Sequence, residues 1–418
     1  MKDPEPPFRP IQYLGSKLRL AKSICGIIEE VKGAGTVIDP FSGTGVVGQE
    51  FARRNWKVVT SDAMEFSNTM CRATLGIGGH PEDHLEEDWG RVLKFSSTIE
   101  YPPKWSKLLS TEQQWIEDND GGSLLGGERL YPRRTDVSSD HKGGIKDSPW
   151  RLTEVFSGTY LGIKQCLELD ALRWALEEVK AEGISDWCYD SIMTALLSSA
   201  SNASYSAGKH FAQFHNTGDS PTEFHKARVI SDRGLKVKEH SGEALDLIER
   251  AAETSGDGHI QLKGPMEELE TGELHFDWVY ADPPYTAQQY SRFYHLLESF
   301  VSPGQFRLMH NDGEATKGLI PPAEDRFQSN FSARTTVREG FSDLISLSER
   351  CQANLAVSYS TSREKNKRMV SLPDLKDILR KKFYVEEHSL DHDGYRQFNI
   401  DAAGVGDSQD ILLVCTRR

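Results

Sequence analysis

The chain has 418 residues, enough for one large domain with an insertion or for two domains. Its formal net charge is −14, whereas a protein that binds nucleic acid mainly by neutralising phosphates is usually basic. The six cysteines are scattered without a C-x-x-C spacing, which argues against a metal site or a disulfide framework and fits a reducing cytoplasm. The N-terminus lacks the apolar run of a signal peptide, and no segment suits a membrane span. We therefore expect a cytoplasmic protein that does not bind membranes and contacts any nucleic acid through local basic patches.

The first part of the chain has the pattern of a βαβ unit. A Pro-rich arm reaches residue 10, and apolar periodicity predicts a helix over 18–30. A short buried strand over 36–39 then leads through a Gly-rich turn into a helix over 46–54 and a second strand over 56–62. A strand, a Gly loop, a helix and a strand in this order indicate a parallel sheet covered by helices.

The pattern weakens after about residue 75 and resumes later. Residues 76–235 hold glycine clusters, mixed charges and two stretches with helical periodicity, 160–180 and 186–200. Strand-like runs return at 276–280, 354–360, 383–388 and 411–416. We predict an α/β domain made of residues 1–75 and 236–418, interrupted by a mixed or helical insertion over 76–235.

The Gly-rich turn, from Asp39 to Gly45, is the first candidate binding element. Glycines at 43 and 45 permit positive φ and close backbone approach at a helix N-terminus. The spacing is not that of a P-loop, and Asp39 would repel a pyrophosphate but attract a cationic or amino-bearing ligand. Asp62 ends the second strand, where an acid can hold a ribose hydroxyl pair. Ribose plus a cationic amino-acid portion describes S-adenosylmethionine, although Asp62 could also be a solvated strand-end or capping acid.

The second candidate element is Asp282-Pro283-Pro284-Tyr285, which follows an apolar run. Two prolines cannot continue a sheet ladder, because each lacks an N–H and has a fixed φ. The strand therefore ends there and presents a carboxylate, prolyl-side carbonyls and a ring. This set suits a planar substrate with an amino group, whereas the simpler interpretation is a strand-terminating turn.

Three elements in order, Tyr13-Leu14-Gly15-Ser16-Lys17, Asp39-Pro40-Phe41-Ser42-Gly43-Thr44-Gly45 and Asp282-Pro283-Pro284-Tyr285, carry a family resemblance. The chain resembles the adenine-specific DNA methyltransferases of the Dam-like class over roughly 10–75 and 240–418. The resemblance implies a Rossmann-like, mostly parallel seven-stranded sheet, with residues 76–235 as target-recognition part and lid. It implies methyl transfer from S-adenosylmethionine to the exocyclic amine of adenine, in a restriction–modification or phage-defence setting.

The resemblance also assigns roles by position. The expected catalytic residues are Asp282, Pro283, Pro284 and Tyr285. The expected cofactor-binding residues are Tyr13, Gly15, Lys17, Asp39, Pro40, Phe41, Gly43, Gly45, Asp62 and Asp282. Ser16 stands where the family more usually has a glycine. The acid that often binds the cofactor's adenine has no clear counterpart, and Glu267 is the nearest candidate.

The residue types indicate a mechanism. The adenine must leave the stack or be met unpaired; Tyr285 would stack on it, while Asp282 and the Pro283 carbonyl accept hydrogen bonds from its amine. Candidate nucleic-acid contacts are Tyr290, Arg292, Lys209, Arg363, Lys365, Lys367 and Arg368. Basic clusters are more often solvated faces, and Lys209 lies in a polar loop that could be a packed helix end.

Double-stranded DNA is the expected substrate, with restriction or defence proteins as candidate partners. Three other interpretations remain open on the sequence: RNA as the substrate, methylation of a cytosine amine, or an inactive binding module. The cytosine enzymes usually carry Ser-Pro-Pro at the catalytic motif, which ranks that alternative lower.

Overall fold

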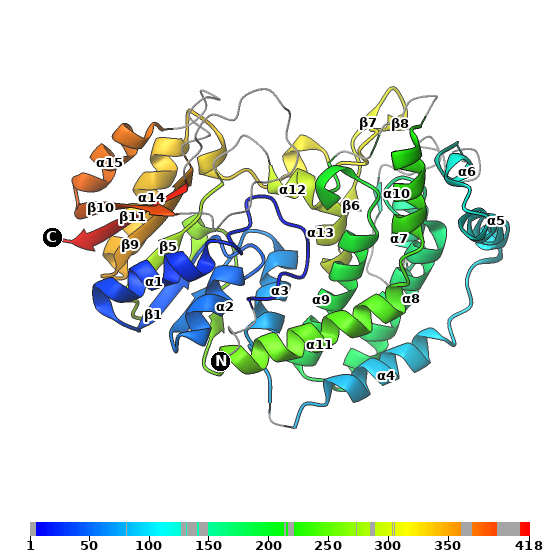
Figure 1. Cartoon of the computed structure of the whole chain (residues 1–418), viewed down its shortest axis with the longest axis horizontal. Helices are drawn as coiled ribbons and strands as arrows, with labels where there is room; N and C mark the ends of the chain where they lie inside the picture. Colours follow the sequence, from blue (N-terminus) through cyan, green and yellow to red (C-terminus); the bar gives the residue numbers. More distant parts are fainter. Residues whose placement is uncertain are drawn as a thin grey trace.

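A computed structural model of the chain is shown in Figure 1. It describes residues 6–80, 82–126, 131, 140–141, 149–212, 215, 221–272, 274–284, 289–302, 304, 306–360, 370–390 and 410–418. Two parts lie side by side in Figure 1, a twisted sheet with its helices and a group of helices beyond α3.

The sheet has seven strands in the order β10-β11-β9-β5-β1-β2-β4. Their bounds are β1 Thr36–Asp39, β2 Lys57–Thr60, β4 Ile260–Gln261, β5 Trp278–Ala281, β9 Asn354–Ser360, β10 Phe383–Leu390 and β11 Asp410–Arg417. All neighbouring pairs from β4 to β9 are parallel, and only β11 runs antiparallel to its two neighbours. The Rossmann-like, mostly parallel seven-stranded sheet expected from the sequence is therefore confirmed.

Both faces of this sheet are covered, because alternate strand residues point to opposite sides. Val37, Val58 and Trp278 pack with helices α1 (Ala21–Lys32) and α2 (Val46–Arg53). The following residue of each strand, Ile38, Val59 and Val279, packs on the opposite face with α14 and α15. These two helices span Val337–Arg350 and Leu372–Arg380. The near-continuous apolar strands are thus explained by burial on both sides.

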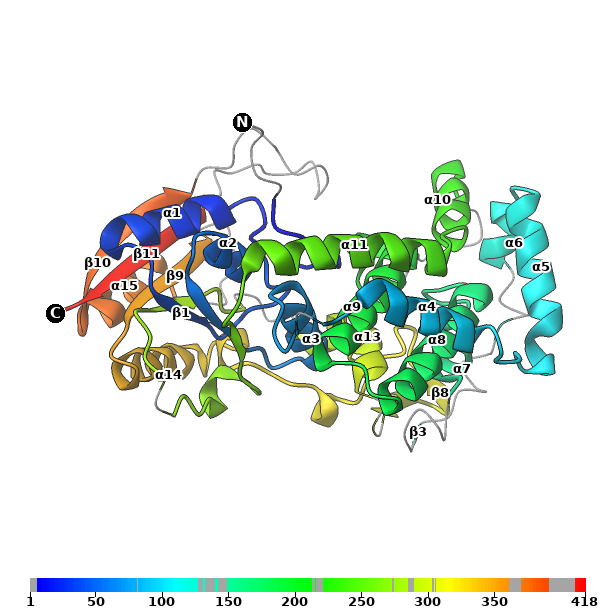
Figure 2. The ribbon, with the colours of Figure 1, turned by 90° about the horizontal axis from the view of Figure 1, so that it is seen from below.

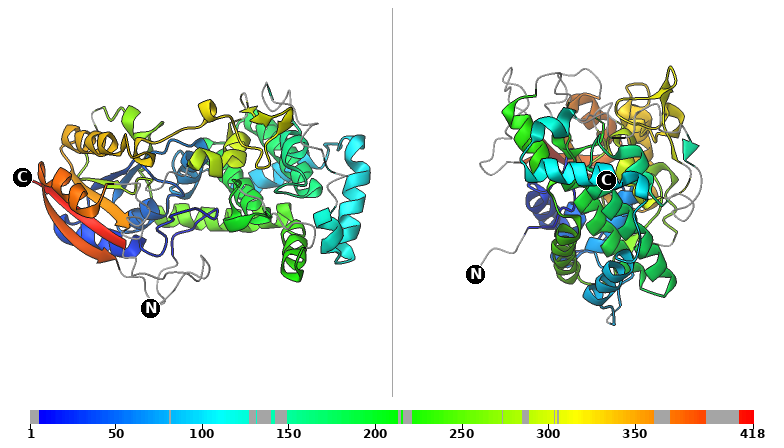
Figure 3. Two further views of the ribbon diagram at one scale, coloured as in Figure 1. Left: turned by 90° about the horizontal axis from the view of Figure 1, so that it is seen from above. Right: turned by 90° about the vertical axis from the view of Figure 1, so that its right-hand side faces the viewer.

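A third core lies beyond the sheet and is formed by helices. It includes residues of α3, α4, α7, α8, α9, α11 and α13, whereas α5, α6 and α10 contribute to two smaller clusters. The bounds are α3 Glu65–Thr74, α4 Leu85–Ser96, α5 Ser106–Glu117, α6 Gly121–Gly126, α7 Arg151–Phe156, α8 Ile163–Ala181, α9 Asp186–Ala203, α10 Glu223–Arg233, α11 Val237–Ser255, α12 Tyr290–Phe293 and α13 His295–Val301. Figure 2 shows α11 running from the sheet side to the helical side, and Figure 3 shows α5 and α6 at the far end. Short strand pairs β3–β6 (Asp140–His141, Phe306–Arg307) and β7–β8 (His310–Asn311, Glu314–Ala315) lie outside the main sheet.

The elements differ from the sequence-based expectation in a few places. The first helix begins at Ala21 rather than at residue 18, and β2 is shorter than expected. Three helices between residues 76 and 150, α4, α5 and α6, were not predicted from the sequence, in which glycine clusters interrupt the helical pattern. In α4 the buried positions Leu85, Trp89, Val92 and Ser96 follow the helical period. None of the helices described is both long and apolar enough to span a bilayer.

Candidate active site

The site lies at the carboxyl ends of three neighbouring parallel strands. Asp39 ends β1, Asp62 follows β2, and Asp282 follows β5. β5 and β1 are adjacent, and the chain continues from them toward opposite edges of the sheet. This point of reversal is where open α/β sheets bind ligands. The topology therefore brings together three carboxylates that are far apart in the sequence.

Backbone hydrogen bonds to carboxylates shape the turn after β1. Asp39 Oδ1 accepts the Phe41 N–H at 3.0 Å, and Asp62 Oδ2 accepts the Gly43 N–H at 3.0 Å. The other Asp62 oxygen accepts the Met64 N–H at 2.9 Å. Burial raises the pKa of Asp62 to about 6 and that of Asp39 well above its usual range. Both acids favour a bound cation or hydrogen-bond donor, which would compensate for their burial.

Gly43 is required because Tyr13 lies against the turn. Its φ is +52°, and a Cβ there would sit 2.9 Å from Tyr13 Cε1. The Tyr13 ring stacks on Tyr294 with centroids 5.1 Å apart and contacts Tyr290 at 5.3 Å. The N-terminal element predicted to bind the cofactor therefore packs directly between the Gly turn and the helices that follow the catalytic motif.

Lys17 and Asp282 form an ion pair at the centre of the site. Lys17 Nζ lies 2.7 Å from Asp282 Oδ2, with the two side chains 10% and 18% exposed. Lys17 Nζ also donates to the Gly15 carbonyl at 3.2 Å. The second carboxylate oxygen, Asp282 Oδ1, is buried and has no hydrogen-bond partner among the described residues. A buried acceptor without a partner is costly unless a ligand supplies a donor.

These groups surround one pocket that encloses about 900 Å³, including its open mouth. Its wall combines carboxylates, backbone groups and aromatic rings, as in sites for small organic ligands. Of the residues predicted to bind the cofactor or catalyse, Gly45 and Pro283 are absent from its wall and Tyr285 lies outside the described residues. The rest line it: Tyr13, Gly15, Lys17, Asp39, Pro40, Phe41, Gly43, Asp62, Asp282 and Pro284. Gly45 instead allows the conformation of the turn: its φ is +74°, and an added Cβ would lie 3.2 Å from Cys71 Sγ.

Comparison with known proteins agrees with this geometry. Residues 13–95 match the family of D12 class N6 adenine-specific DNA methyltransferases. The chain is related to this family. The match covers the N-terminal element, the Gly turn and Asp62, so the resemblance found in the sequence is confirmed.

Similar proteins include three bacterial methylases. The modification methylase LlaI of Lactococcus lactis subsp. lactis is 25% identical over 96% of this chain, which covers 54% of that protein. The type II methyltransferase M.FokI of Planomicrobium okeanokoites is 21% identical over 70% of the chain, covering 37% of its own length. The type II methyltransferase M.NlaIII of Neisseria lactamica is 24% identical over 70% of the chain and is covered to 69%. The chain thus spans about half of the LlaI methylase and less of M.FokI.

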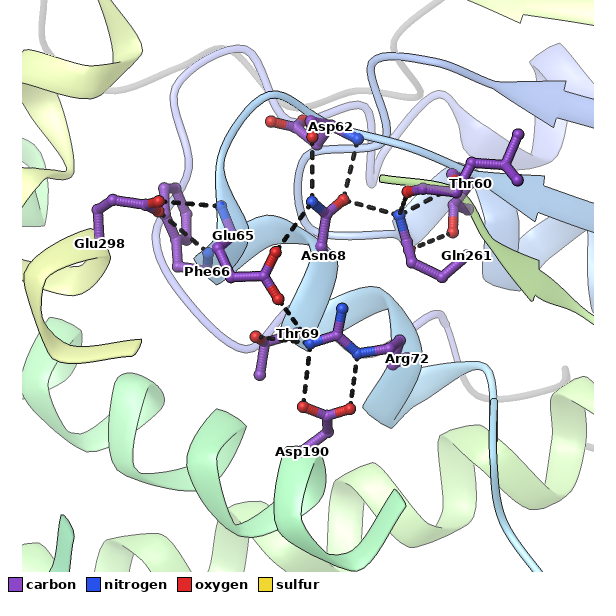
Figure 4. A network of polar contacts seen from close by, with 11 residues as sticks. Thr60, Asp62, Glu65, Phe66, Asn68, Thr69, Arg72, Asp190, Gln261 and Glu298 are labelled. Atoms are coloured by element: carbon purple, nitrogen blue, oxygen red, sulfur yellow. Dashed lines mark hydrogen bonds and ion pairs between the residues drawn. The ribbon is translucent and has the colours of Figure 1, made fainter. Parts of the chain in front are cut away.

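A polar network next to the pocket contains Asn68, which the sequence analysis did not predict to support the site. Asn68, 2% exposed on α3, accepts the Asp62 N–H at 2.9 Å and donates to the Asp62 carbonyl at 3.0 Å. Its Oδ1 also accepts a hydrogen bond from Gln261 of β4 at 2.7 Å (Figure 4). Both backbone polar groups of the expected ribose-binding acid are therefore held by one side chain.

The same network continues toward the helical part. Arg72 donates to Glu65 at 2.8 Å and makes two hydrogen bonds to Asp190 of α9, at 2.6 and 3.1 Å (Figure 4). The bidentate geometry is specific to an arginine–carboxylate pair. α3 thus carries contacts to Asp62 at one end and to the expected insertion at the other. The sequence alone does not predict this linkage, because Arg72 and Asp190 are far apart in the chain and meet only in the folded protein.

The predicted nucleic-acid contacts fall in different environments. Tyr290 lines the pocket and donates from its hydroxyl to the Leu14 carbonyl at 2.9 Å. Arg292 is exposed and makes no ion pair within the described part of the chain. Lys209 lies in a packed turn, where Nζ donates to Asn202 O, Ser204 O and Asp232 Oδ1 at 2.7–2.8 Å. A nucleic-acid contact by Lys209 would have to break these bonds. The remaining candidates, Arg363, Lys365, Lys367 and Arg368, lie outside the described residues.

Two more residues complete the pocket wall. Glu267 lines it beside Pro265 and Met266, and burial raises its pKa. Its position is compatible with the expectation that it contacts the cofactor's adenine. Phe327, 37% exposed, also lines the pocket and had no signal in the sequence analysis. Its carbonyl accepts a hydrogen bond from Ser291 Oγ at 2.9 Å, which ties it to α12.

Proposed function

We propose that this chain is an adenine-specific DNA methyltransferase that uses S-adenosylmethionine. The observation that carries the proposal is Asp282 Oδ1, a buried acceptor without a partner among the described residues, at the edge of the pocket. The relationship to the D12 class and the names of the similar methylases support the same chemistry. The similar proteins named as modification or type II methylases also support a modification role for this chain.

The pocket residues fit the proposed cofactor by their chemistry. Asp62 supplies carboxylate oxygens as acceptors for a ribose. Asp39 supplies a carboxylate for a cationic amino acid portion, whose charge would compensate for the burial that raises the pKa of Asp39. Pro265 and Met266 supply an apolar wall. Bound there, S-adenosylmethionine would supply an electrophilic methyl group on a positively charged sulfur.

The chain's own residues would bind and orient the adenine amine. Lys17 occupies Asp282 Oδ2, which leaves Oδ1 to accept an N–H of the amine. The Pro283 carbonyl is the second proposed acceptor, and Tyr285 the proposed stacking partner. Two acceptors on the amine would turn its lone pair out of conjugation and toward the methyl group. Acceleration then comes from orientation and preorganised electrostatics rather than from a covalent intermediate.

Incubation with tritium-labelled S-adenosylmethionine and either double-stranded DNA or RNA tests the proposal. We expect label in adenine of the DNA and none after Asp282→Ala; a binding measurement on the variant separates a loss of methyl transfer from a loss of cofactor binding. Label in RNA only would identify RNA as the substrate. Label in cytosine would contradict the adenine specificity. Cofactor binding without label in any nucleic acid would instead identify a binding module.

A further inference from the structure

Helix α3 begins at the edge of the pocket without a cap from its own segment. It starts at Glu65, and Ala63 and Met64 immediately before it line the pocket. The first four N–H groups of a helix lack partners within the helix. The N-cap residue is Met64, whose side chain makes no capping hydrogen bond. The first turn therefore depends on an acceptor from elsewhere.

Glu298 of α13 supplies this acceptor. Its Oε1 accepts the Glu65 N–H at 3.1 Å, and its Oε2 accepts the Phe66 N–H at 3.1 Å. Figure 4 shows the carboxylate pointing at the start of α3 from the neighbouring helix. A negative charge at this position also interacts favourably with the positive end of the helix dipole. Glu298 thus takes the place of a capping side chain.

The helix that carries Glu298 is also tied to the opposite wall of the pocket. Tyr294, which directly precedes α13, accepts the Leu14 N–H at 2.8 Å and donates to Gln12 O at 3.3 Å. Leu14 belongs to the N-terminal element that lines the pocket. α12 and α13 follow Asp282 in the chain. The segment after the catalytic motif therefore connects two walls of the pocket, one through Tyr294 and the other through Glu298.

A second cavity gives Glu298 access to solvent. The cavity is lined by Glu298 and His295 and shares Ala63, Met64 and Phe327 with the cofactor pocket. Burial, with smaller contributions from the Glu65 and Asp62 carboxylates, raises the pKa of Glu298 to about 7, although the two backbone hydrogen bonds lower it. Other charged or titratable groups around α13 and the cavity are His295, Arg307, Asp325, Arg151 and Arg173. Arg307 is paired with Asp325, at 2.7 Å between Nε and Oδ2, and the other two arginines contact carbonyls at the C-terminal end of α13.

We propose that Glu298 is a positioning residue for the methyltransferase site: by capping α3 it holds the Ala63–Met64 edge of the pocket, and its ionisation makes cofactor binding depend on pH. When ionised, both oxygens accept backbone N–H groups. When protonated, one oxygen carries a hydrogen and no longer accepts, so the first turn of α3 loses a partner. This inference rests on the proposed use of S-adenosylmethionine.

The test is calorimetric measurement of the Kd for S-adenosylmethionine on the full chain from pH 5.5 to 8.5. We expect the wild-type Kd to rise about threefold to tenfold as pH falls through 7. Glu298→Gln should bind more weakly at pH 8 and lack the change near pH 7. Any change centred near pH 6 belongs to Asp62 and persists in the variant. Glu339→Gln, at an exposed acid in the first turn of α14, is the matched control and should follow the wild type.

The outcomes separate this inference from the proposed function. A wild-type Kd without a change near pH 7 overturns the role of Glu298 even if the variant fails to fold. A Glu298→Gln protein that keeps the wild-type Kd and its pH dependence overturns it as well. Wild-type protein that binds no S-adenosylmethionine at any pH overturns the proposed function, and this inference with it. In methylation assays, Glu298→Gln should raise the KM for the cofactor more than it lowers kcat.

Discussion

Lys17 Nζ lies 2.7 Å from Asp282 Oδ2 and so joins the N-terminal element to the motif proposed to be catalytic. The sequence indicated cofactor binding for Lys17 and both cofactor binding and catalysis for Asp282, without predicting a contact between them. In the folded protein the lysine occupies one carboxylate oxygen and leaves the other without a partner among the described residues. The two elements are therefore linked by an ion pair in the folded protein.

This pairing predicts strong non-additivity between Lys17→Met and Asp282→Asn. Each single substitution should lower the methyl-transfer rate by about 10²-fold, the range of one preorganised electrostatic contact. Adding Lys17→Met to Asp282→Asn should cost much less, because the ion pair is already gone. Single-turnover methylation of DNA measures the cycle. Lys32→Met is the control, since Lys32 pairs with Asp277 at 2.6 Å but is 51% exposed. Additive losses at 17 and 282 would show that the pair does not act as a unit.

Gly43→Ala is predicted to damage the pocket through the turn after β1. The residue needs φ +52°, and its new Cβ would lie 2.9 Å from Tyr13 Cε1. A left-handed conformation costs a non-glycine residue about 1–2 kcal/mol. We expect the free energy of unfolding to fall by about this amount and the Kd for S-adenosylmethionine to rise about tenfold, because relief of the contact moves Tyr13.

Gly90→Ala is the matched control for this prediction. Gly90 is an exposed residue of α4, and no atom lies within 4 Å of the position that an added Cβ would take. Alanine there should leave the Kd unchanged and stabilise the helix by up to about 1 kcal/mol. Equal effects of the two substitutions on cofactor binding would contradict a specific role for the turn.

The parts of the site that the sequence predicted depend on local patterns. Asp39 ends one strand, Asp62 and Asp282 follow two others, and the carboxyl ends of parallel strands meet at one edge of the sheet. The Gly turn is also local, because the positive φ of Gly43 is required within a few residues. These features are predictable without knowing which distant segments come together.

The supporting contacts could not be predicted, because they join segments far apart in the chain. Asn68 looks like an ordinary helical residue until Asp62 lies beside it. Met64 at an N-cap gives no capping signal, since the acceptor comes from Glu298. For Lys209, the polar loop suggested a nucleic-acid contact, and the sequence could not show that its ammonium donates to Asp232 and to two carbonyls.

Asn68→Asp is predicted to weaken cofactor binding while keeping the size of the side chain. The aspartate cannot donate to the Asp62 carbonyl, which Asn68 contacts at 3.0 Å. It also places a negative charge against that oxygen and next to Asp62. A buried acceptor left without its donor costs about 1–3 kcal/mol, so we expect the Kd for S-adenosylmethionine to rise tenfold or more. Asn202→Asp, at a helical amide that donates to Ser198 O at 3.0 Å, should leave the Kd unchanged.

His295 is predicted to make stability depend on pH below neutrality. Burial lowers its pKa to about 4, and it is 2% exposed. The unfolded chain takes up a proton below about pH 6.5, while the native protein stays neutral at this residue until about pH 4. Its stabilising contribution is therefore complete above pH 6.5 and is lost as pH falls, by at most about 1.4 kcal/mol per pH unit. Glu298 and Asp170 have the opposite effect on stability. Their pKa values are raised to about 7, so between pH 7 and the lower pKa values of the unfolded chain they stabilise the native protein as pH falls.

The measurement is therefore the difference in unfolding free energy between wild type and His295→Gln at pH 7.5, 6 and 5, because the two acids contribute equally to both proteins. We expect the wild type to lose its advantage over the variant by up to about 2 kcal/mol between pH 7.5 and 5; a constant difference across this range would contradict the buried neutral histidine.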